Sequence, residues 1–156
     1  MIFHGILKDS PLGTIHIYAT QKGICSVQFT PKIFSEQVEG QETLIIQECK
    51  LQLQLYFQGK LEQFSIPTDI SGTDFQCLVW NKMQKIKRGE TISYKTLAAS
   101  LGKPLAARAV GNACQKNPLL IIVPCHRVVG KNNSLTGYAG ELWRKQWLLD
   151  SEKQTV

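Results

Sequence analysis

The sequence predicts an α+β fold, in which a small antiparallel sheet with one helix precedes a mostly helical part. Residues 13–18 and 24–29 alternate or are β-branched and flank a turn signal at residues 21–23, a pattern that favours a β-hairpin. Between residues 41 and 57, apolar residues recur at a near-helical period that ends at Gly59, which indicates an amphipathic helix packed on the sheet.

A non-periodic segment separates the two parts. Residues 66–72 contain Pro67 and the polar pair Thr68-Asp69, and domain boundaries fall in segments of this kind. A helix should follow, with Thr73 or Asp74 as its N-cap, because the apolar residues after this point lie at helical spacing. We therefore expect an N-terminal domain at residues 1–68 and a C-terminal domain at residues 69–156.

Charge is distributed unevenly over these two parts. Residues 1–68 carry 5 Lys/Arg and 6 Asp/Glu, a net charge of −1, whereas residues 69–156 carry 13 and 6, a net charge of +7, which together give the +6 of the chain. A basic domain attracts polyanions such as nucleic acid. The alternative is a solvated basic face that only favours solubility.

Composition also excludes some classes of protein. No apolar run approaches the roughly 20 residues that a membrane-spanning helix needs, and the first ten residues lack the basic region of a secretory signal. The five cysteines are odd in number, scattered and without C-x-x-C spacing, which argues against a disulfide framework and favours a reducing compartment. We expect a protein that is not secreted and that acts in the cytoplasm, or in the nucleus in a eukaryote.

A helix-turn-helix is predicted in the C-terminal domain. Ser93 is a suitable N-cap for a helix that stops at Gly102, and Pro104 is suited to open a second helix that runs to about Lys116. The second helix begins with small residues, which let a helix backbone approach a nucleic-acid groove closely. Tight packing against a neighbouring helix is the alternative interpretation.

A candidate nucleophile follows a buried apolar run. Residues 119–123 are apolar and β-like, and they end in Pro124-Cys125-His126-Arg127. A thiolate is the reactive form of cysteine, and an imidazole or a nearby cation favours it. The alternative is a small buried cysteine beside a structural histidine.

The wider set of motifs resembles the O6-alkylguanine-DNA alkyltransferase family. The resemblance covers residues 69–152 and extends more weakly into residues 1–68, where Ser10-Pro11-Leu12-Gly13 and the helix ending near Phe57 match. The motifs that carry it are Pro124-Cys125-His126-Arg127-Val128-Val129, Arg108-Ala109-Val110-Gly111, Asn117-Pro118, Gly89-Glu90-Thr91-Ile92-Ser93-Tyr94, Gly72-Thr73-Asp74-Phe75-Gln76 and Gly137-Tyr138-Ala139-Gly140.

This resemblance implies a fold and a reaction. The N-terminal domain would be ribonuclease H-like, and the C-terminal domain would bind DNA through a winged-helix-like helix-turn-helix. The reaction would be a single-turnover transfer of an alkyl group from O6 of guanine to the cysteine, without a cofactor, and O4 of thymine is a second possible site of attack. The partner would be double-stranded DNA that contains O6-alkylguanine, bound by a monomer.

The resemblance also implies roles for single residues. Cys125 matches the alkyl acceptor, and His126 matches the residue that draws the thiol proton through a water, in a relay completed by Glu152. Tyr94 matches the tyrosine that pushes on the phosphate and donates a hydrogen bond near the flipped base, and Arg108 matches the arginine that fills the gap in the duplex.

Further matched residues would form the surroundings of the base. Asn117 would brace the turn between the recognition helix and the active-site strand, and the small residues Ala106, Ala107 and Ala109 would let the helix enter the minor groove. The backbone and wall of the guanine pocket would come from Val128, Tyr138, Ala139 and Gly140.

The sequence departs from the family pattern at Glu141 and at the zinc ligands, and two other functional classes share some of its features. Glu141 occupies a position where the family commonly has a glycine, which implies an extra charge at the pocket rim. Some members bind zinc in the N-terminal domain, but only His4 and Cys25 are candidates here, so no metal is expected.

Two other functions are the alternatives to this one. The alkyltransferase-like lesion-binding proteins lack the acceptor cysteine. A cysteine hydrolase would need a third residue of a catalytic triad and oxyanion-hole glycines, which the sequence does not show.

Overall fold

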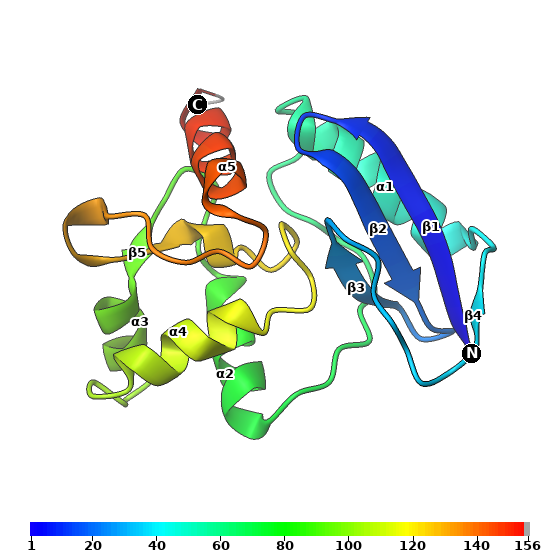
Figure 1. The fold of residues 1–156 in the computed structure, drawn as a ribbon. Coiled ribbons are helices and arrows are strands. Elements are labelled where there is room, and N and C mark those ends of the chain that lie inside the picture. Colours follow the sequence, from blue (N-terminus) through cyan, green and yellow to red (C-terminus); the bar gives the residue numbers. More distant parts are fainter. Residues whose placement is uncertain (155–156) are drawn as a thin grey trace. The chain divides into compact units, whose positions relative to one another are not determined.

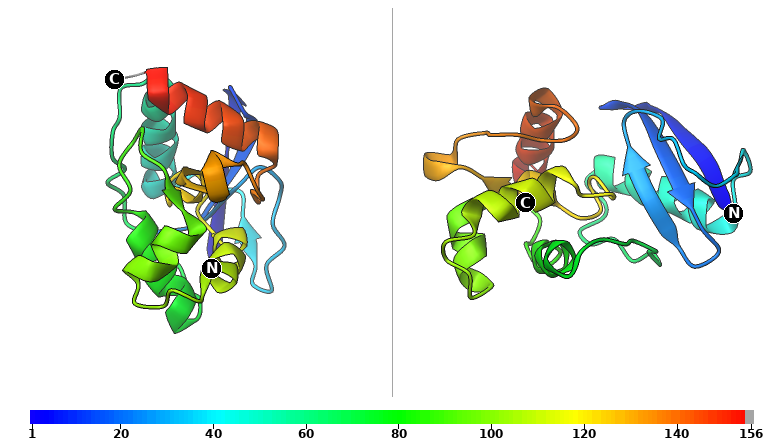
Figure 2. Two further views of the ribbon diagram at one scale, coloured as in Figure 1. Left: turned by 90° about the vertical axis from the view of Figure 1, so that its left-hand side faces the viewer. Right: turned by 60° about the horizontal axis from the view of Figure 1, so that its bottom comes forward.

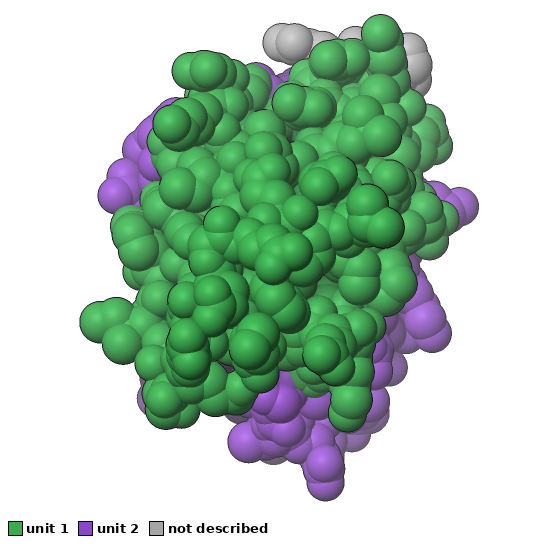
Figure 3. Space-filling view, turned by 90° about the vertical axis from the view of Figure 1, so that its right-hand side faces the viewer, with its two compact units in different colours: residues 1–70 green, residues 71–156 purple. Residues whose placement is uncertain are grey.

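The computed structural model describes residues 1–154 and confirms the predicted α+β fold. The chain divides into two compact units, the first comprising Met1–Ile70 and the second beginning at Ser71 (Figure 3). Among the described residues, no helix has the length and the apolar character needed to cross a membrane.

The first unit is built on a four-stranded sheet with the strand order β3-β2-β1-β4 (Figure 1). The predicted hairpin corresponds to β2 and β3, which pair antiparallel, and β1 pairs antiparallel with β2 on the other side. The short β4 departs from the antiparallel prediction, because it runs parallel to β1. The strands span Ile2–Ser10 (β1), Gly13–Ala19 (β2), Ile24–Gln28 (β3) and Val38–Glu39 (β4).

Helix α1 (Leu44–Phe57) lies across one face of this sheet (Figure 2). It begins three residues later than the apolar period suggested, with Thr43 as its N-cap. Ile46 and Leu53 are fully buried on its inner side. The close approach requires glycine at position 5, since a Cβ atom there would lie 2.5 Å from Cγ2 of Ile46.

The second unit is mostly helical, as predicted. Its regular elements are α2 (Asp74–Met83), β5 (Ile92–Ser93), α3 (Tyr94–Ser100), α4 (Ala107–Gln115), β6 (Val128–Val129) and α5 (Leu142–Gln154). Two short 3-10 helices, η1 (Cys125–Arg127) and η2 (Lys131–Asn133), flank β6, which pairs in parallel with β5. Buried side chains of α2 and α4 form part of the core, and Nε1 of Trp80 donates to the carbonyl oxygen of Ala113 at 2.9 Å.

The predicted helix-turn-helix consists of α3 and α4. The hydroxyl of Ser93 caps α3 by accepting from the backbone N–H of Thr96 at 3.0 Å, and Gly102 ends the helix with a φ of +72°. The second helix starts later than predicted, because the backbone N–H of Ala106 bonds to the carbonyl of Lys103 and closes a turn around Pro104. Helix α4 therefore begins at Ala107.

The β-like assignment of residues 119–123 is wrong, because residues 120–122 form a turn and not an extended strand. The backbone N–H of Val123 bonds to the carbonyl of Leu119 at 2.9 Å, and Ile121 has a φ of +74°. A short apolar run signals burial but does not distinguish an extended strand from a buried turn. Cys125 consequently follows a compact turn and begins η1.

The N-cap of α2 provides a test of the local stability of the second unit. Thr73 and Gln76 form a reciprocal capping box, in which each side chain bonds to the backbone N–H of the other residue. Thr73→Ala should lower the free energy of unfolding by about 1 kcal/mol, because one bonded cap is lost. Thr43→Ala is the matched control, since Thr43 caps α1 without a side-chain hydrogen bond. Equal losses for both variants in chemical denaturation would contradict this interpretation.

Candidate active site

Cys125 is a buried thiol held by one amide side chain. Its residue is only 3% exposed, and Nδ2 of Asn117 donates to Sγ at 3.2 Å and to the carbonyl oxygen of Val123 at 2.8 Å. Oδ1 of Asn117 accepts from the backbone N–H of Leu119 at 2.9 Å. These three bonds join the end of the α4 region to the turn that leads into the cysteine.

The thiol of Cys125 is protonated at neutral pH. Burial raises its pKa to about 11, although the hydrogen bond from Asn117 and the charge of Lys145 lower it in part. A thiolate is the nucleophilic form of cysteine. The site therefore needs a base that removes the proton when the sulfur reacts.

The adjacent residues meet a single buried carboxylate near the end of α5. Glu152 accepts a hydrogen bond from Nε2 of His126 at 2.8 Å, and it accepts two from Arg127, through Nε and Nη2, each at 2.9 Å. Nη1 of Arg127 donates to the carbonyl oxygen of Ile86 at 2.6 Å. All three charged or titratable residues are buried, at 0% exposure for His126, 7% for Arg127 and 2% for Glu152.

These contacts determine the protonation of the imidazole. Burial alone raises the pKa of Glu152, but the hydrogen bonds from His126 and Arg127 outweigh it and hold the pKa well below its usual range. Burial lowers the pKa of His126 more than Glu152 raises it, so the ring is neutral. Because the carboxylate only accepts hydrogen bonds, Nε2 carries the proton and the lone pair is on Nδ1. Nδ1 is buried and has no protein partner among the described residues.

Lys145 is a buried site residue that the sequence analysis missed. It is 0% exposed on α5, and its ammonium group donates to the carbonyl oxygens of Val128 at 2.7 Å, Thr136 at 2.9 Å and Gly137 at 3.4 Å. It thereby joins β6 to the loop before α5. A lone lysine in a sequence usually indicates a solvated surface. However, Lys145 is spaced at i+3 and i+7 from the buried Leu148 and Glu152, and this helical spacing could have identified Lys145 as a buried residue.

The predicted pocket residues lie on β6, on the loop that Lys145 joins to it, and at the start of α3. Oη of Tyr94, the first residue of α3, donates to the carbonyl oxygen of Thr136 at 3.3 Å, and the Lys145 ammonium lies 5.7 Å from the Tyr94 ring centre. Val128 is buried on β6. In the loop, Tyr138 and Gly140 are buried whereas Ala139 is exposed.

Glu141 adopts a backbone conformation that favours glycine. Its φ is +78°, in the left-handed region where a side chain is strained. The carboxylate is on the surface, where Oε2 accepts from Nε1 of Trp143 at 2.9 Å and lies 3.9 Å from a guanidinium nitrogen of Arg144. The departure from glycine therefore places a negative charge beside the loop, as expected.

The remaining predicted residues lie on α4 and do not join the Cys125 cluster. Arg108 and Ala109 are exposed, and Ala106 and Ala107 are partly exposed, whereas Val110 is buried on the opposite side. No hydrogen bond among the described residues links these outward residues to the cysteine. They form a separate part of the candidate site.

The helix-turn-helix and the loops around Cys125 contain no acidic residue. Residues 91–140 have no Asp or Glu, but they include the six cations Lys95, Lys103, Arg108, Lys116, Arg127 and Lys131. Arg127 is neutralised by Glu152, and Glu90 and Glu141 lie just outside the segment. The segment thus has the charge expected for contact with a polyanion.

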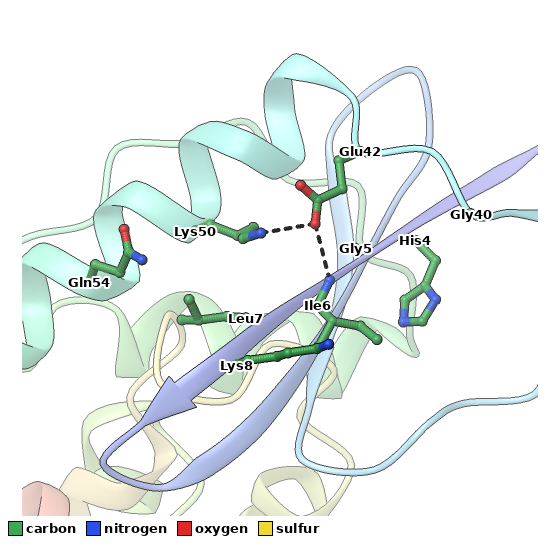
Figure 4. A pocket seen from close by; sticks show the side chains of 9 residues that line it. All are labelled: His4, Gly5, Ile6, Leu7, Lys8, Gly40, Glu42, Lys50 and Gln54. Carbon is green, nitrogen blue, oxygen red and sulfur yellow. Dashed lines mark hydrogen bonds and ion pairs between the residues drawn. The ribbon is translucent and has the colours of Figure 1, made fainter.

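A hollow of about 560 Å³ lies in the first unit, between β1, the segment before α1 and the middle of α1; His4 lines it, but none of the residues predicted for alkyl transfer or DNA binding does (Figure 4). Its charges are partly compensated, because Oε1 of Glu42 accepts from Nζ of Lys50 at 2.9 Å and from the backbone N–H of Ile6 at 3.4 Å. Because no cysteine lines it, it is not a candidate for the chemistry at Cys125.

The two residues considered for zinc lie in the first unit. Nε2 of His4 is 3.1 Å from Nδ1 of His16, and the His4 ring stacks on Tyr18. Cys25 is a free, half-buried thiol on β3. Within residues 1–154, no three His, Cys, Asp or Glu side chains are grouped so that they could hold a metal ion.

Comparison with known proteins finds two adjoining family models. Residues 2–70 match the ribonuclease-like domain of 6-O-methylguanine DNA methyltransferase, and residues 74–154 match its DNA-binding domain. The chain is 41% identical over 153 residues to a methylated-DNA–protein-cysteine methyltransferase of Methanosarcina barkeri, covering 95% of this chain and 96% of the relative. A Mycobacterium leprae protein of the same name is 41% identical over 157 aligned positions, covering 99% of this chain and 95% of the relative.

Solved structures agree with these matches. The crystal structure of Mycobacterium tuberculosis O6-methylguanine methyltransferase superposes with a TM-score of 0.90 at 36% identity, over 100% of this chain and 95% of that one. A structure of the mycobacterial protein in complex with DNA gives a TM-score of 0.88 at 37% identity, over 99% of this chain and 94% of that one.

The buried carboxylate yields a prediction about stability and pH. Glu152→Gln should lower the free energy of unfolding at pH 7 by about 3–5 kcal/mol, because the Arg127 charge stays buried without its partner. A depressed pKa means that the carboxylate stabilises the fold above the ordinary glutamate pKa of about 4.3, and that this contribution is lost as the pH falls toward the depressed value. Chemical denaturation at several pH values should therefore show a difference in the free energy of unfolding between wild type and variant that becomes smaller below about pH 4.

Asp150→Asn is the control for this experiment, since Asp150 is an exposed carboxylate in the same helix. It should leave the free energy of unfolding nearly unchanged. If Glu152→Gln lowered the free energy of unfolding by the same amount at pH 3 and at pH 7, the conclusion that Glu152 is ionised in the folded protein would be refuted.

Proposed function

The chain belongs to the 6-O-methylguanine DNA methyltransferase family, and we propose that it repairs DNA by moving an alkyl group from O6 of guanine onto its own Cys125. The observation that carries this proposal is the buried Cys125 thiol, bonded to Asn117 and followed directly by the His126–Glu152 pair. The activity is that of a methylated-DNA–protein-cysteine S-methyltransferase, which acts once per molecule.

In the first step, the sulfur loses its proton. The lone pair of His126 is on Nδ1, because Nε2–H is committed to Glu152. We infer that Nδ1 takes the Cys125 proton through one bridging water. The carboxylate of Glu152 stabilises the imidazolium that forms, while Asn117 donates to the thiolate.

In the second step, the thiolate attacks the alkyl carbon. The Sγ–C bond forms as the C–O6 bond breaks, and the electron pair of that bond moves to the guanine, which takes up a proton to become normal guanine. We propose that Tyr94 donates a hydrogen bond to the base as this charge develops. Val128, Tyr138, Ala139 and Gly140 would surround the guanine.

The product is a thioether, which has no exchangeable proton and whose carbon–sulfur bond could break only by expelling a thiolate, a poor leaving group. The proposed relay can take a proton from sulfur but supplies nothing that would cleave a carbon–sulfur bond. Transfer is therefore irreversible, needs no cofactor and consumes the protein stoichiometrically.

Duplex DNA must release the damaged base before this chemistry, because the thiol is buried and O6 of a stacked guanine is out of its reach. We propose that residues 69–156 form the domain that binds DNA and accepts the alkyl group, with residues 1–68 as a separate N-terminal domain. Ala106, Ala107 and Ala109 would let α4 enter the minor groove, and Arg108 would fill the gap left by the base. We further propose that the protein works as a monomer and, because its substrate is genomic DNA, that it acts in the cytoplasm, or in the nucleus of a eukaryote.

The alternative is a non-catalytic protein that only binds alkylated DNA. Such a protein would have no use for a base beside a cysteine, whereas here Cys125 is in place next to a neutral imidazole. The buried pair of His126 and Glu152 therefore favours the transferase.

The first prediction of this proposal concerns the acceptor. After incubation with an O6-methylguanine oligonucleotide, mass spectrometry should find one added methyl group, on Cys125. Cys125→Ala should abolish transfer yet still bind the duplex, because the nucleophile and the outward residues of α4 are separate. Methylation of another cysteine, or repair by the variant, would refute the assignment.

The second prediction concerns Arg108. Arg108→Ala should slow repair of a duplex by about 10- to 100-fold, since extruding a base costs a few kcal/mol. Its reaction with free O6-benzylguanine should hardly change, because no base has to be extruded. Single-turnover rates on both substrates provide the measurement, and equal losses on the two would count against a role in extrusion.

A further inference from the structure

Leu105 is an apolar side chain placed in water at the entrance to α4. It is 99% exposed, and it lies in the turn closed by the bond from the backbone N–H of Ala106 to the carbonyl of Lys103. The preceding Pro104 is also exposed. Because the second unit buries almost none of the Leu105 side chain, this leucine does not stabilise the fold through removal of apolar surface from water.

Leu105 belongs to the same outward side of the helix-turn-helix as Arg108. The positions exposed around it are Arg108, Ala109 and Asn112, whereas Val110 is buried on the side that packs on the unit. Leu105 lies three positions before Arg108, in the turn that leads directly into α4, so the two exposed side chains are close neighbours along the chain. A surface that meets Arg108 therefore meets Leu105 as well.

The charge of the surroundings limits the kind of partner. Residues 91–140 contain no acidic side chain, and Lys103 precedes Leu105 in the turn. A partner of this surface has to be anionic and still offer apolar atoms to a leucine. The minor groove of duplex DNA does so, since phosphates line its edges and deoxyribose carbons its walls, and apolar side chains are often inserted there.

We propose that Leu105 is a DNA contact of this protein, which packs its side chain against the apolar walls of the minor groove just before Arg108 in the chain. The proposal rests on the proposed function, because it takes alkylated duplex DNA as the substrate. The side chain supplies affinity through removal of apolar surface from water, and this part of the affinity does not depend on counterion release.

Salt dependence separates this role from a contact to phosphate. Loss of a cation that neutralises a phosphate reduces the slope of log K against log salt by about 1. Leu105→Ala should instead weaken binding to a duplex by about 5- to 10-fold at every salt concentration, with an unchanged slope, because part of a buried leucine is lost. Lys103→Ala, which removes an exposed cation from the same turn, should reduce the slope, which gives a direct comparison within one surface.

Ile33→Ala is the matched control, because Ile33 is 96% exposed and lies in the first unit. It should change neither affinity nor slope. Thermal melting of Leu105→Ala should equal that of wild type, since the side chain has no contact with the core to lose. Leu105→Lys should bind tightly at low salt and show a steeper slope.

The outcomes distinguish this inference from the proposed function. If wild type transfers no alkyl group to Cys125, the function itself fails. If wild type repairs DNA but Leu105→Ala binds the duplex as tightly as wild type does, or loses affinity together with a shallower slope, the proposed contact is wrong. A change only in self-association, seen by sedimentation without DNA, would identify a second copy of the chain as the occupant and would also overturn the proposal.

Discussion

The rest of the site depends on the hydrogen bonds that the buried carboxylate of Glu152 accepts from two neighbouring side chains. The carboxylate binds His126 and Arg127 at once, and Arg127 continues to the carbonyl of Ile86, so the last helix, the turn that carries Cys125 and the segment after α2 are fixed together. The same contacts set the chemistry of the imidazole, because an ionised acceptor at Nε2 leaves the lone pair at Nδ1. Stability and reactivity therefore depend on the same hydrogen bonds.

Lys145 and Asn117 can be buried in this interior because each of them is hydrogen-bonded. A buried ammonium or amide costs free energy unless it is hydrogen-bonded. Lys145 donates to three carbonyl oxygens, and Asn117 uses both atoms of its amide. Both residues also hold the segments next to Cys125, so their satisfaction in the fold orients the nucleophile and the loop that would cover the base.

Local signals explain which parts of the structure could be predicted from the sequence. The cap at Ser93 and the stop at Gly102 depend on short-range chemistry and were identified correctly, and Thr73 was one of the two N-caps proposed for α2. Strand β1 was not predicted, because its buried and exposed residues do not alternate strictly. Its place in the sheet is set by pairing with β2 and β4, and β4 is distant in the sequence. Lys145 was missed because its burial depends on carbonyl groups that come together only in the folded unit.

The protonation state of His126 at neutral pH tests the central claim most directly. Nitrogen-15 NMR of the imidazole can distinguish the two neutral tautomers from the imidazolium. The proposed mechanism requires a neutral ring with its proton on Nε2, bonded to Glu152, and a lone pair on Nδ1 next to a protonated Cys125 thiol. A ring protonated on Nδ1, or an imidazolium paired with a Cys125 thiolate, would contradict it.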